Sequence, residues 1–226
     1  MILSGAGISA ESGLSTFRDV DGLWEKYDIN DVATIDAWGK NPELVLSFYD
    51  ARRVQVKNAK PNAAHYALAD LEHHFDVAIV TQNIDDLHER SGSSNILHLH
   101  GEITKGRSVK SDLNLYPINS KIELGDLAPD GEQMRPHIVW FGEQVPKMSE
   151  AEKLVKNCDV LIVVGTSLNV YPAAGLRHAC SEQSAKFLVD PNQLLLGEPE
   201  FVHFQGSATD KIPLLVDQLI RDYGDA

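Results

Sequence analysis

The stretch ILSGAGISAESG, residues 2–13, indicates the kind of fold that this chain adopts. It reads as the end of a buried strand, followed by a glycine-rich turn and a small polar segment. Gly5, Gly7 and Ala10 have the G-x-G-x-x-G/A spacing of dinucleotide-binding loops. In such loops the backbone can approach a pyrophosphate because no bulky side chain intervenes, and N–H groups at a helix start face the anion. Turns with this spacing also occur without a ligand, so a purely structural turn stays the alternative.

The sequence after this turn differs from that of a nicotinamide dehydrogenase. Such an enzyme has a helix directly after the loop and then a second strand with an acidic residue about 20 residues further on. Here a polar loop with Arg18 follows, and the next apolar strand begins only at Val77. The sequence therefore predicts a phosphate-binding loop outside the context of hydride transfer.

Length and composition predict one globular domain with a small satellite. A chain of 226 residues with 43% hydrophobic residues can bury one sizeable core. No apolar run approaches the roughly 18 residues that span a bilayer, and no charged-then-apolar leader is visible, so we expect a cytoplasmic protein without membrane contact. Cys158 and Cys180 stand 22 residues apart, which is neither a metal-ligand pattern nor a disulfide framework. Such cysteine usage fits a reducing compartment.

The net charge of −13, from 20 basic and 33 acidic residues, bears on the choice of partner. Binding of nucleic acid needs a basic face, so we expect none. An acidic surface suits a basic partner such as a lysine-bearing peptide, but it also simply keeps a protein in solution.

Short apolar runs alternate with helical patterns along most of the chain. Helix starts are marked by N-cap residues, namely Thr34, Asn41 before Pro42, and Asn62. We expect strands at 77–81, 96–99, 137–141, 160–164, 187–189 and 201–204, and helices at 34–40, 41–57, 62–75, 149–157, 173–182 and 207–223. This alternation predicts an α/β fold, a Rossmann-like parallel sheet with helices on both faces. Residues 103–135 are rich in Gly, Ser, Asn, Asp and Pro and indicate a small insert module.

Further stretches carry a resemblance to a known family. They are GAGIS (5–9), TFRD (16–19) with GLW (22–24), TQNIDDLH (81–88), HGE (100–102), RPHIVWFGE (135–143) and GTSL (165–168). Together, and in this order, they resemble the sirtuin family of NAD-dependent protein deacylases. The resemblance implies an NAD-binding domain formed by residues 1–102 and 137–226, a small module at 103–136, and a helical segment 30–60 on the acyl-lysine side.

The resemblance implies that the acyl oxygen of a modified lysine displaces nicotinamide from NAD, and that the acyl group ends on ADP-ribose. The cosubstrates would then be NAD and acyl-lysine peptides or proteins. Phe17 would shield the cationic sugar from water, and Arg18 would order the loop and the phosphates. The family's pattern implies NAD-binding roles for Gly5, Ala6, Gly7, Phe17, Arg18, Gln82, Asn83, Asp85, Gly165, Thr166, Ser167, Asp190 and Ala208. Asp190 stands where the family commonly has Asn, but a carboxylate can also accept from ribose hydroxyls.

His100, with Asn83 and Asp85, is the expected catalytic group. An imidazole titrates near neutral pH, so it can remove a proton from a ribose hydroxyl. His98 is the competing histidine, because residues two apart on a strand point the same way. Only the position before Gly101 favours His100, which matches the family's base.

The segment Val139, Trp140 and Phe141 resembles the family's peptide-binding strand. There, main-chain pairing with the peptide gives affinity with little sequence preference. The alternative is that the two aromatic side chains belong to the core, and strand alternation allows one to point inward and one outward.

Two departures bear on the subtype. The family's small module usually carries four cysteines on a structural zinc, but 103–136 contains neither Cys nor His, so we expect no metal. Tyr49 and Arg52 share one helix face and resemble the Tyr-x-x-Arg pair of the desuccinylase-type (class III) sirtuins. That pair would bind the carboxylate of succinyl-, malonyl- or glutaryl-lysine, since Arg offers a bidentate fork. The alternative is an exposed helix face in which Arg53 is an equivalent neighbour.

Several functions therefore stay open. They are a deacylase that prefers anionic acyl groups, a deacetylase without that preference, an NAD hydrolase or ADP-ribosyltransferase, and a non-catalytic NAD or ADP-ribose sensor. The peptide segment and Tyr49 with Arg52 count against the hydrolase, and His100 counts against the sensor. We expect a monomer.

Overall fold

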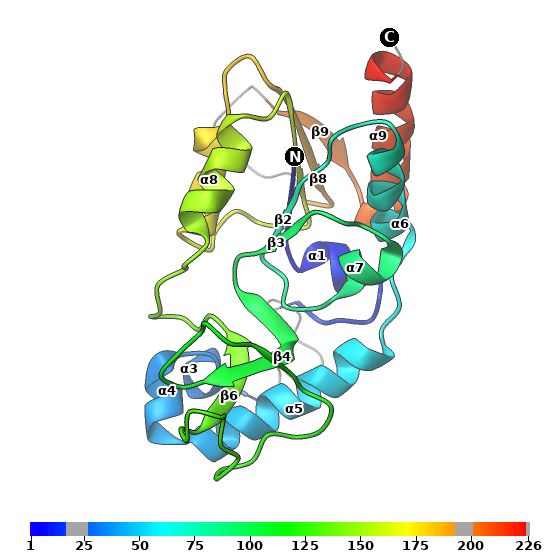
Figure 1. Cartoon of the computed structure of the whole chain (residues 1–226). Coiled ribbons are helices and arrows are strands. Elements are labelled where there is room, and N and C mark those ends of the chain that lie inside the picture. Colours follow the sequence, from blue (N-terminus) through cyan, green and yellow to red (C-terminus); the bar gives the residue numbers. More distant parts are fainter. Residues whose placement is uncertain (17–26, 193–200, 225–226) are drawn as a thin grey trace.

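A parallel sheet of six strands forms the upper body of the molecule in Figure 1. The computed structural model describes residues 1–16, 27–192 and 201–224, so Phe17 and Arg18 lie outside the described residues. The strands are β1 (Ile2–Ser4), β2 (Ile79–Thr81), β3 (Ile96–His98), β7 (Val160–Val164), β8 (Ala185–Asp190) and β9 (Val202–Gln205). Their order is β3-β2-β1-β7-β8-β9, all parallel. From β1 the chain adds β2 and β3 on one side, and it then returns to add β7, β8 and β9 on the other side of β1. The strand order therefore reverses between β1 and β7, and open α/β sheets bind ligands at such a switch point.

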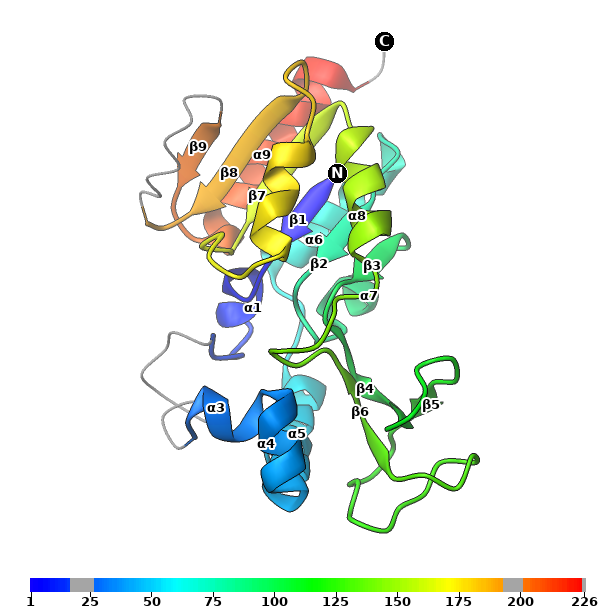
Figure 2. The ribbon, with the colours of Figure 1, turned by 90° about the vertical axis from the view of Figure 1, so that its left-hand side faces the viewer.

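Helices cover both faces of this sheet, as Figures 1 and 2 show. On one face, α6 (Ala63–Asp70) and α9 (Ala208–Tyr223) pack on side chains such as Ile79 and Ile162. On the other face, α8 (Met148–Lys156) and the 3-10 helix η2 (Ala173–Ala179) pack on side chains such as Val80 and Leu161. Neighbouring residues of one strand thus enter opposite cores, which is why these strands are apolar throughout. The predicted α/β fold with helices on both faces is confirmed.

The predicted helix starts are also confirmed. Thr34 accepts from the Ala37 N–H at the start of α4 (Ile35–Lys40), and Asn41 accepts from the Leu44 N–H at the start of α5 (Pro42–Asn58). Asn62 caps α6 in a capping box, and Ser207 caps α9. These short polar side chains satisfy N–H groups that have no partner within the helix.

Three predicted elements were wrong in extent or kind. The helix expected at 62–75 ends at Asp70 and continues as a 3-10 turn, η1 (Leu71–His73), while the segment at 173–182 is the 3-10 helix η2. The strand expected at 137–141 is β6 (Met134–Ile138), and it pairs antiparallel with β4 (Gly101–Ser108) rather than in the parallel sheet. An apolar run does not reveal which sheet it joins, because only tertiary contacts decide this.

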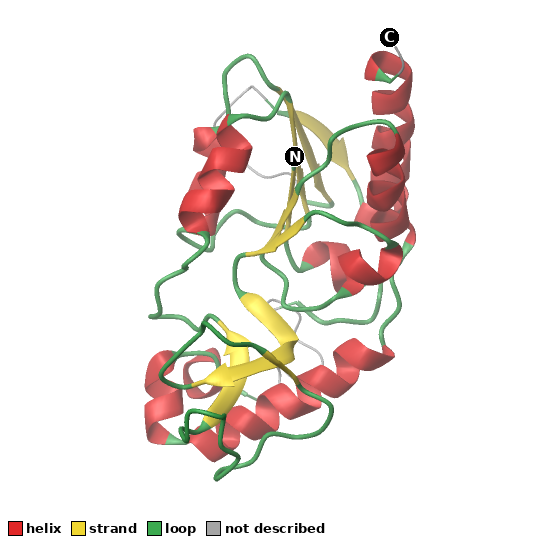
Figure 3. Cartoon of the chain, viewed as in Figure 1, coloured by secondary structure: helices red, strands yellow, loops and turns green. Residues whose placement is uncertain are grey.

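The lower body consists of helices and a small sheet, drawn in Figure 3. Its sheet has the order β5-β4-β6, with β5 at Tyr116–Pro117, and its helices are α3 (Ile29–Val32), α4 and α5. The core between them contains Phe48 and Trp140. Of the helices in the described residues, α1 (Gly7–Ala10) and α7 (Leu87–Ser91) also belong to the upper body.

The helix α5 holds the insert module in place. Arg53 donates from Nε to the Ile103 carbonyl oxygen at 2.8 Å, and Asp50 accepts from the Ile122 N–H at 3.3 Å. Leu46 of α5 packs with Ile122 and Ile118 of the module in a cluster of its own. The module is therefore attached by apolar packing and by hydrogen bonds that reach its backbone.

Two further features concern the sequence expectations. Cys158 and Cys180 are both free, and their sulfurs lie 3.9 Å apart. None of the helices in the described part of the chain combines the length and apolar character that crossing a membrane requires.

Candidate functional site

A cavity of about 540 Å³ opens at the carboxyl ends of β1 and β7 and extends to α5 of the lower body. A volume of this size suits a small-molecule site. Every expected site residue that the structure describes lines it, and Phe17 and Arg18 lie outside the described residues. The lining includes Gly5, Ala6, Gly7, Tyr49, Arg52, Gln82, Asn83, Asp85, His100, Val139, Trp140, Phe141, Gly165, Thr166, Ser167, Asp190 and Ala208.

The two glycine turns after β1 and β7 pack against each other. A Cβ on Gly7 would lie 2.7 Å from the Gly165 Cα, and one on Gly165 would lie 2.3 Å from the Ile8 nitrogen. Gly165 also has a φ of +62°, a conformation that L side chains rarely adopt. These glycines are therefore required for the contact between the two turns, independently of whether they also let a phosphate approach the backbone.

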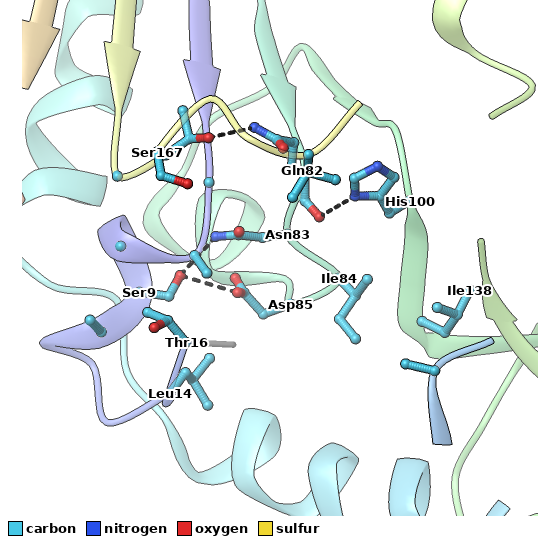
Figure 4. Close-up of a pocket in the computed structure, with 18 of the residues that line it drawn as sticks. Ser9, Leu14, Thr16, Gln82, Asn83, Ile84, Asp85, His100, Ile138 and Ser167 are labelled. Carbon is cyan, nitrogen blue, oxygen red and sulfur yellow. Dashed lines mark hydrogen bonds between the residues drawn. The ribbon is translucent and has the colours of Figure 1, made fainter. Parts of the chain in front are cut away.

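Asn83 and Asp85 are joined through Ser9 of α1. Asn83 donates from Nδ2 to Ser9 Oγ at 3.1 Å, and Ser9 donates from Oγ to Asp85 Oδ2 at 3.1 Å (Figure 4). The other oxygen of Asp85 accepts from the Leu87 N–H at 3.1 Å. Burial raises the pKa of Asp85, and the hydrogen bonds from Leu87 and Ser9 oppose this rise. The network fixes the direction of both side chains below the cavity.

The ring of His100 lines the same cavity. Its Nδ1 lies 3.0 Å from the Gln82 carbonyl oxygen, an obligatory acceptor, so Nδ1 carries the proton and donates. The Nε2 atom is then left with its lone pair in the neutral ring. Burial lowers the pKa of His100, which favours this neutral form. Figure 4 shows the ring beside Gln82, whose side-chain amide points toward the Gly165–Ser167 turn.

On the side of β7, β8 and α9, polar or small residues line the cavity. Gln82 donates from Nε2 to Thr166 Oγ1 at 3.2 Å, which joins the turns after β2 and β7. Asp190, at the end of β8, accepts from the Asn192 N–H at 2.8 Å. Ala208 begins α9, so its N–H is among those that have no partner within the helix.

The segment after β6 forms another wall. Trp140 is 2% exposed and stacks under the Arg135 guanidinium at 3.4 Å, whereas Phe141 is 44% exposed. One side chain therefore points inward and the other outward, as strand alternation allows. The N–H groups of Val139, Trp140 and Phe141 donate to His100, Glu143 and Ala33 respectively. In this conformation the three N–H groups are not available for pairing with a peptide strand.

Tyr49 and Arg52 lie on the cavity side of α5. Tyr49 is buried, and burial raises the pKa of its phenol, so the hydroxyl keeps its proton. Arg52 donates from Nη2 to the Ser15 carbonyl oxygen at 2.8 Å and from Nη1 to Gln55 Oε1 at 3.2 Å. Within 1–16, 27–192 and 201–224, no carboxylate forms an ion pair with Arg52. Arg53 is not equivalent to it, because Arg53 is buried and binds Ile103 and Asp50.

Sequence reasoning gave no role to three polar residues of the cavity. Ser9 stands in a stretch that the resemblance covers, but its role depends on Asp85, 76 residues further on, whereas Ser207 lines the cavity and caps α9 through the N–H of Asp210. Asn192 lies two residues after Asp190 and also lines the cavity. These residues could have been found in the sequence only because each carries an amide or hydroxyl group and stands close to an expected NAD-binding residue.

The strand order, the crevice at the switch point and the paired glycine turns define a dinucleotide-binding α/β protein. Comparison with protein families makes this more specific. The chain belongs to the Sir2 family, whose model matches residues 5–172.

Relatives and solved structures agree with this assignment. The chain is 56% identical over 191 residues to an NAD-dependent protein deacylase of Helicobacter pylori, covering 84% of this chain and 83% of the relative. It is 45% identical over 231 residues to a protein of the same name from Vibrio vulnificus, covering 97% and 93%. A crystal structure of a Sir2 homologue–NAD complex matches with a TM-score of 0.88 and 37% identity, over 98% of this chain and 89% of that one. A Sir2 structure with a deacetylated p53 peptide and 3'-O-acetyl ADP ribose matches with a TM-score of 0.80 and 30% identity, over 100% and 93%.

Proposed function

We propose that this protein is an NAD-dependent protein-lysine deacylase that prefers acyl groups ending in a carboxylate, such as succinyl, malonyl or glutaryl. Membership of the Sir2 family and the names of its relatives support the deacylase activity. The observation that supports the acyl preference is that Tyr49 and Arg52 line the same cavity as His100.

Electrostatics favour an anionic acyl group at this end of the cavity. A guanidinium can bind a carboxylate through two parallel hydrogen bonds, and such a bond is stronger when water is excluded. The protonated phenol of Tyr49 can donate to the same carboxylate. Burial lowers the pKa of Arg52, but a guanidinium remains charged in proteins. With an acetyl group, this half-buried cation would keep its bonds to Ser15 and Gln55 but would have no carboxylate in ion-pair contact among the described residues.

The catalytic assignment follows from the geometry around His100. NAD supplies a ribose carbon from which nicotinamide departs and a hydroxyl on which the acyl group is received. His100, neutral and with its Nδ1 proton held by Gln82, would accept the proton of that hydroxyl at Nε2. Asn83 and Asp85, oriented by Ser9, would hold the sugar and the carboxamide. The glycine turns and the start of α9 would bind the phosphates and the adenosine.

The acyl preference can be tested with matched peptides and variants. The enzyme is incubated with NAD and a peptide carrying succinyl- or acetyl-lysine, and the products are identified by mass spectrometry. Replacing Arg52 with Met should lower kcat/KM for the succinyl peptide by about 10- to 100-fold, because a charge-assisted hydrogen bond to the substrate is lost. Deacetylation should change little.

The control is Lys57→Met, which removes an exposed cation from the same helix. Equal losses on both peptides in Arg52→Met would contradict the acyl preference and leave a deacetylase without it. Free ADP-ribose without acylated ADP-ribose would instead indicate an NAD hydrolase, and unchanged NAD would indicate a sensor.

We further propose that the insert module folds without zinc. Residues 103–136 offer no thiolate or imidazole, and their place is held by α5 through Leu46, Asp50 and Arg53. EDTA should therefore change neither the thermal midpoint nor the activity. Loss of activity in EDTA that added zinc restores would refute this.

A further inference from the structure

Two histidines bind successive carbonyl groups of the segment that carries Gln82 and Asn83. The Nδ1 atom of His100 lies 3.0 Å from the Gln82 oxygen, and the Nδ1 atom of His98 lies 3.1 Å from the Asn83 oxygen. A carbonyl oxygen can only accept, so both rings carry a proton on Nδ1. The two rings thereby fix the backbone of one wall of the cavity.

The two histidines differ at their second nitrogen. Whereas the His100 ring lines the cavity, His98 Nε2 lies 2.7 Å from Glu89 Oε1 of α7. A carboxylate is again an acceptor, so the surroundings of His98 call for a donor at both nitrogens, which only the imidazolium provides. The His98 residue is 6% exposed, so water has little access to the ring, although the Glu89 side chain is 38% exposed.

The charges around the two rings agree with this difference. Burial acts against a charge on His98, but the hydrogen bond and the charge of Glu89 outweigh it and raise the pKa of His98. Burial acts to raise the pKa of Glu89, but the hydrogen bond and the charge of His98 lower it, and the net shift is downward. The other charged or titratable groups that act on His98 or are acted on by it are Glu102, Asp85 and His88.

We propose that His98 is a positioning residue that holds Asn83 in place as an imidazolium paired with Glu89, and that loss of its proton sets the alkaline limit of NAD use. The acid limit would be set by protonation of His100. This inference rests on the proposed function, since it concerns how the same site keeps its shape.

Deprotonation would disturb Asn83 whichever proton is lost. If the neutral ring keeps its proton on Nδ1, it still donates to the Asn83 carbonyl, but the lone pair of Nε2 faces the Glu89 carboxylate and the repulsion displaces the ring. If the proton moves to Nε2, the lone pair of Nδ1 faces the Asn83 carbonyl. Asn83 is otherwise held by its N–H, which donates to Thr81 Oγ1 at 3.1 Å, and by its side chain on Ser9. Release of the carbonyl therefore leaves the amide side chain in the cavity less well oriented.

The same side chains could be taken for a cation site, because ligand atoms of Glu89, His98 and Glu102 lie within 4.8 Å of one another. Both nitrogens of His98 are engaged, however, and Glu102 pairs with Lys105 at 2.7 Å. The contacts fit an ion pair rather than a metal ligand set.

The test combines a direct titration with kinetics on the full chain. Nitrogen-15 NMR of the imidazoles should show His98 protonated on both nitrogens at pH 7 and His100 on one. In Glu89→Gln the amide keeps an acceptor but loses the charge, so the alkaline limb of kcat/KM for NAD should move down by about one pH unit. The acid limb and the KM for the acyl peptide should not move.

Matched variants separate positioning from general damage. Glu72→Gln changes a half-buried carboxylate that binds Ser94 just before β3, and it should leave both limbs unchanged. His98→Gln keeps one donor and no titratable group, so the alkaline limb should flatten while the KM for NAD rises several-fold. His98→Phe, which has no donor at either position, should raise the KM for NAD further.

A neutral His98 at pH 7, or an unmoved alkaline limb in Glu89→Gln, would overturn the proposal. Calorimetric titration with NAD across the same pH range gives a readout that does not need turnover. If the protein bound NAD but removed no acyl group, the proposed function would fail while the His98 titration and the pH dependence of binding still tested this inference.

Discussion

His100 combines the two properties that a general base needs at neutral pH. Its tautomer is fixed by the Gln82 carbonyl, and burial lowers its pKa, so the neutral form persists to lower pH than for a free imidazole. Replacing His100 with Ala should lower kcat by about 10²- to 10⁴-fold, the usual contribution of a positioned base. The dissociation constant for NAD should change little. In the parent protein, activity should fall only as the pH drops below the ordinary histidine value of about 6.5, which a pH profile of kcat/KM would check.

A large loss of NAD affinity in His100→Ala would contradict this role, because it would mean that the ring mainly binds or supports the site. Single residues also show where sequence reasoning ends. His100 could be identified by its position before Gly101, but the bond from Ser9 to Asp85 joins residues 76 apart in sequence. A serine hydroxyl in a short helix gives no sign of a distant partner, so the role of Ser9 appears only in the folded chain.

At the scale of elements, the turn after β7 depends on the absence of side chains. A methyl group on Gly165 would meet the Ile8 nitrogen at 2.3 Å, and the residue would need a φ of +62°. Gly165→Ala should therefore destabilise the protein by about 1–3 kcal/mol, from strain and from displacement of the turn. Urea unfolding measures this change, and NAD affinity should fall with it.

Gly39 in α4 provides the matched control. Nothing lies within 4 Å of a Cβ built there, and the residue is helical. Gly39→Ala should stabilise the protein by about 0.5–1 kcal/mol, since Ala loses less conformational freedom in a helix. If both substitutions had the same effect, the close contact of the two turns would not be what requires Gly165.

Elements differ in how far the sequence reveals them. The starts of α4 and α5 are encoded locally by Thr34 and Asn41, whose side chains bind N–H groups three residues away. The direction of β6 is not encoded locally, because it depends on pairing with β4, some thirty residues earlier. Local capping can be read from a short window, whereas strand pairing depends on contacts between distant segments.

On the scale of the whole molecule, the site is assembled from both bodies. The parallel sheet brings the turns and His100 to one edge, and α5 brings Tyr49 and Arg52 to the same cavity from below. The helix face that carries Arg52 was visible in the sequence, but only the family resemblance, and not the helical pattern, implied that this face is directed toward the cavity. The 22-residue spacing of Cys158 and Cys180 likewise gave no hint that their sulfurs lie 3.9 Å apart. They meet because α8 and η2 lie on the same face of the sheet.

A pair of buried histidines should make the whole fold acid-labile. The rings of His65 in α6 and His88 in α7 lie 5.1 Å apart, and His88 Nε2 lies 3.0 Å from Ser4 Oγ. Burial lowers the pKa of His65 to about 4 and that of His88 to about 3. Protonation of His65 would also break the capping box, in which its Nδ1 accepts from the Asn62 N–H.

The sign of the effect follows from proton uptake. Below about pH 6.5 both histidines take up a proton in the unfolded chain but not in the native state. Each histidine therefore lowers the free energy of unfolding by up to about 1.4 kcal/mol for every pH unit by which the pH falls. This loss continues to about pH 4 for His65 and about pH 3 for His88. Burial also lowers the pKa values of His100 and His137, which adds to this loss, whereas the raised pKa of the buried Asp85 opposes it. His98, with its raised pKa, stabilises the native state below about pH 6.5 and loses this contribution as the pH rises. Stability should therefore be highest near pH 6.5.

Urea unfolding midpoints between pH 4.5 and pH 8 would measure this curve. His65→Gln provides the informative variant, because Gln at the third helical position can keep the capping box while it does not titrate. Its acid slope should be smaller than that of the parent by up to about 1.4 kcal/mol per pH unit, the contribution of one histidine. His73→Gln changes an exposed histidine, with 78% of its side chain accessible, and should leave the slope as it is. An acid slope that His65→Gln does not reduce would show that other groups cause the acid lability.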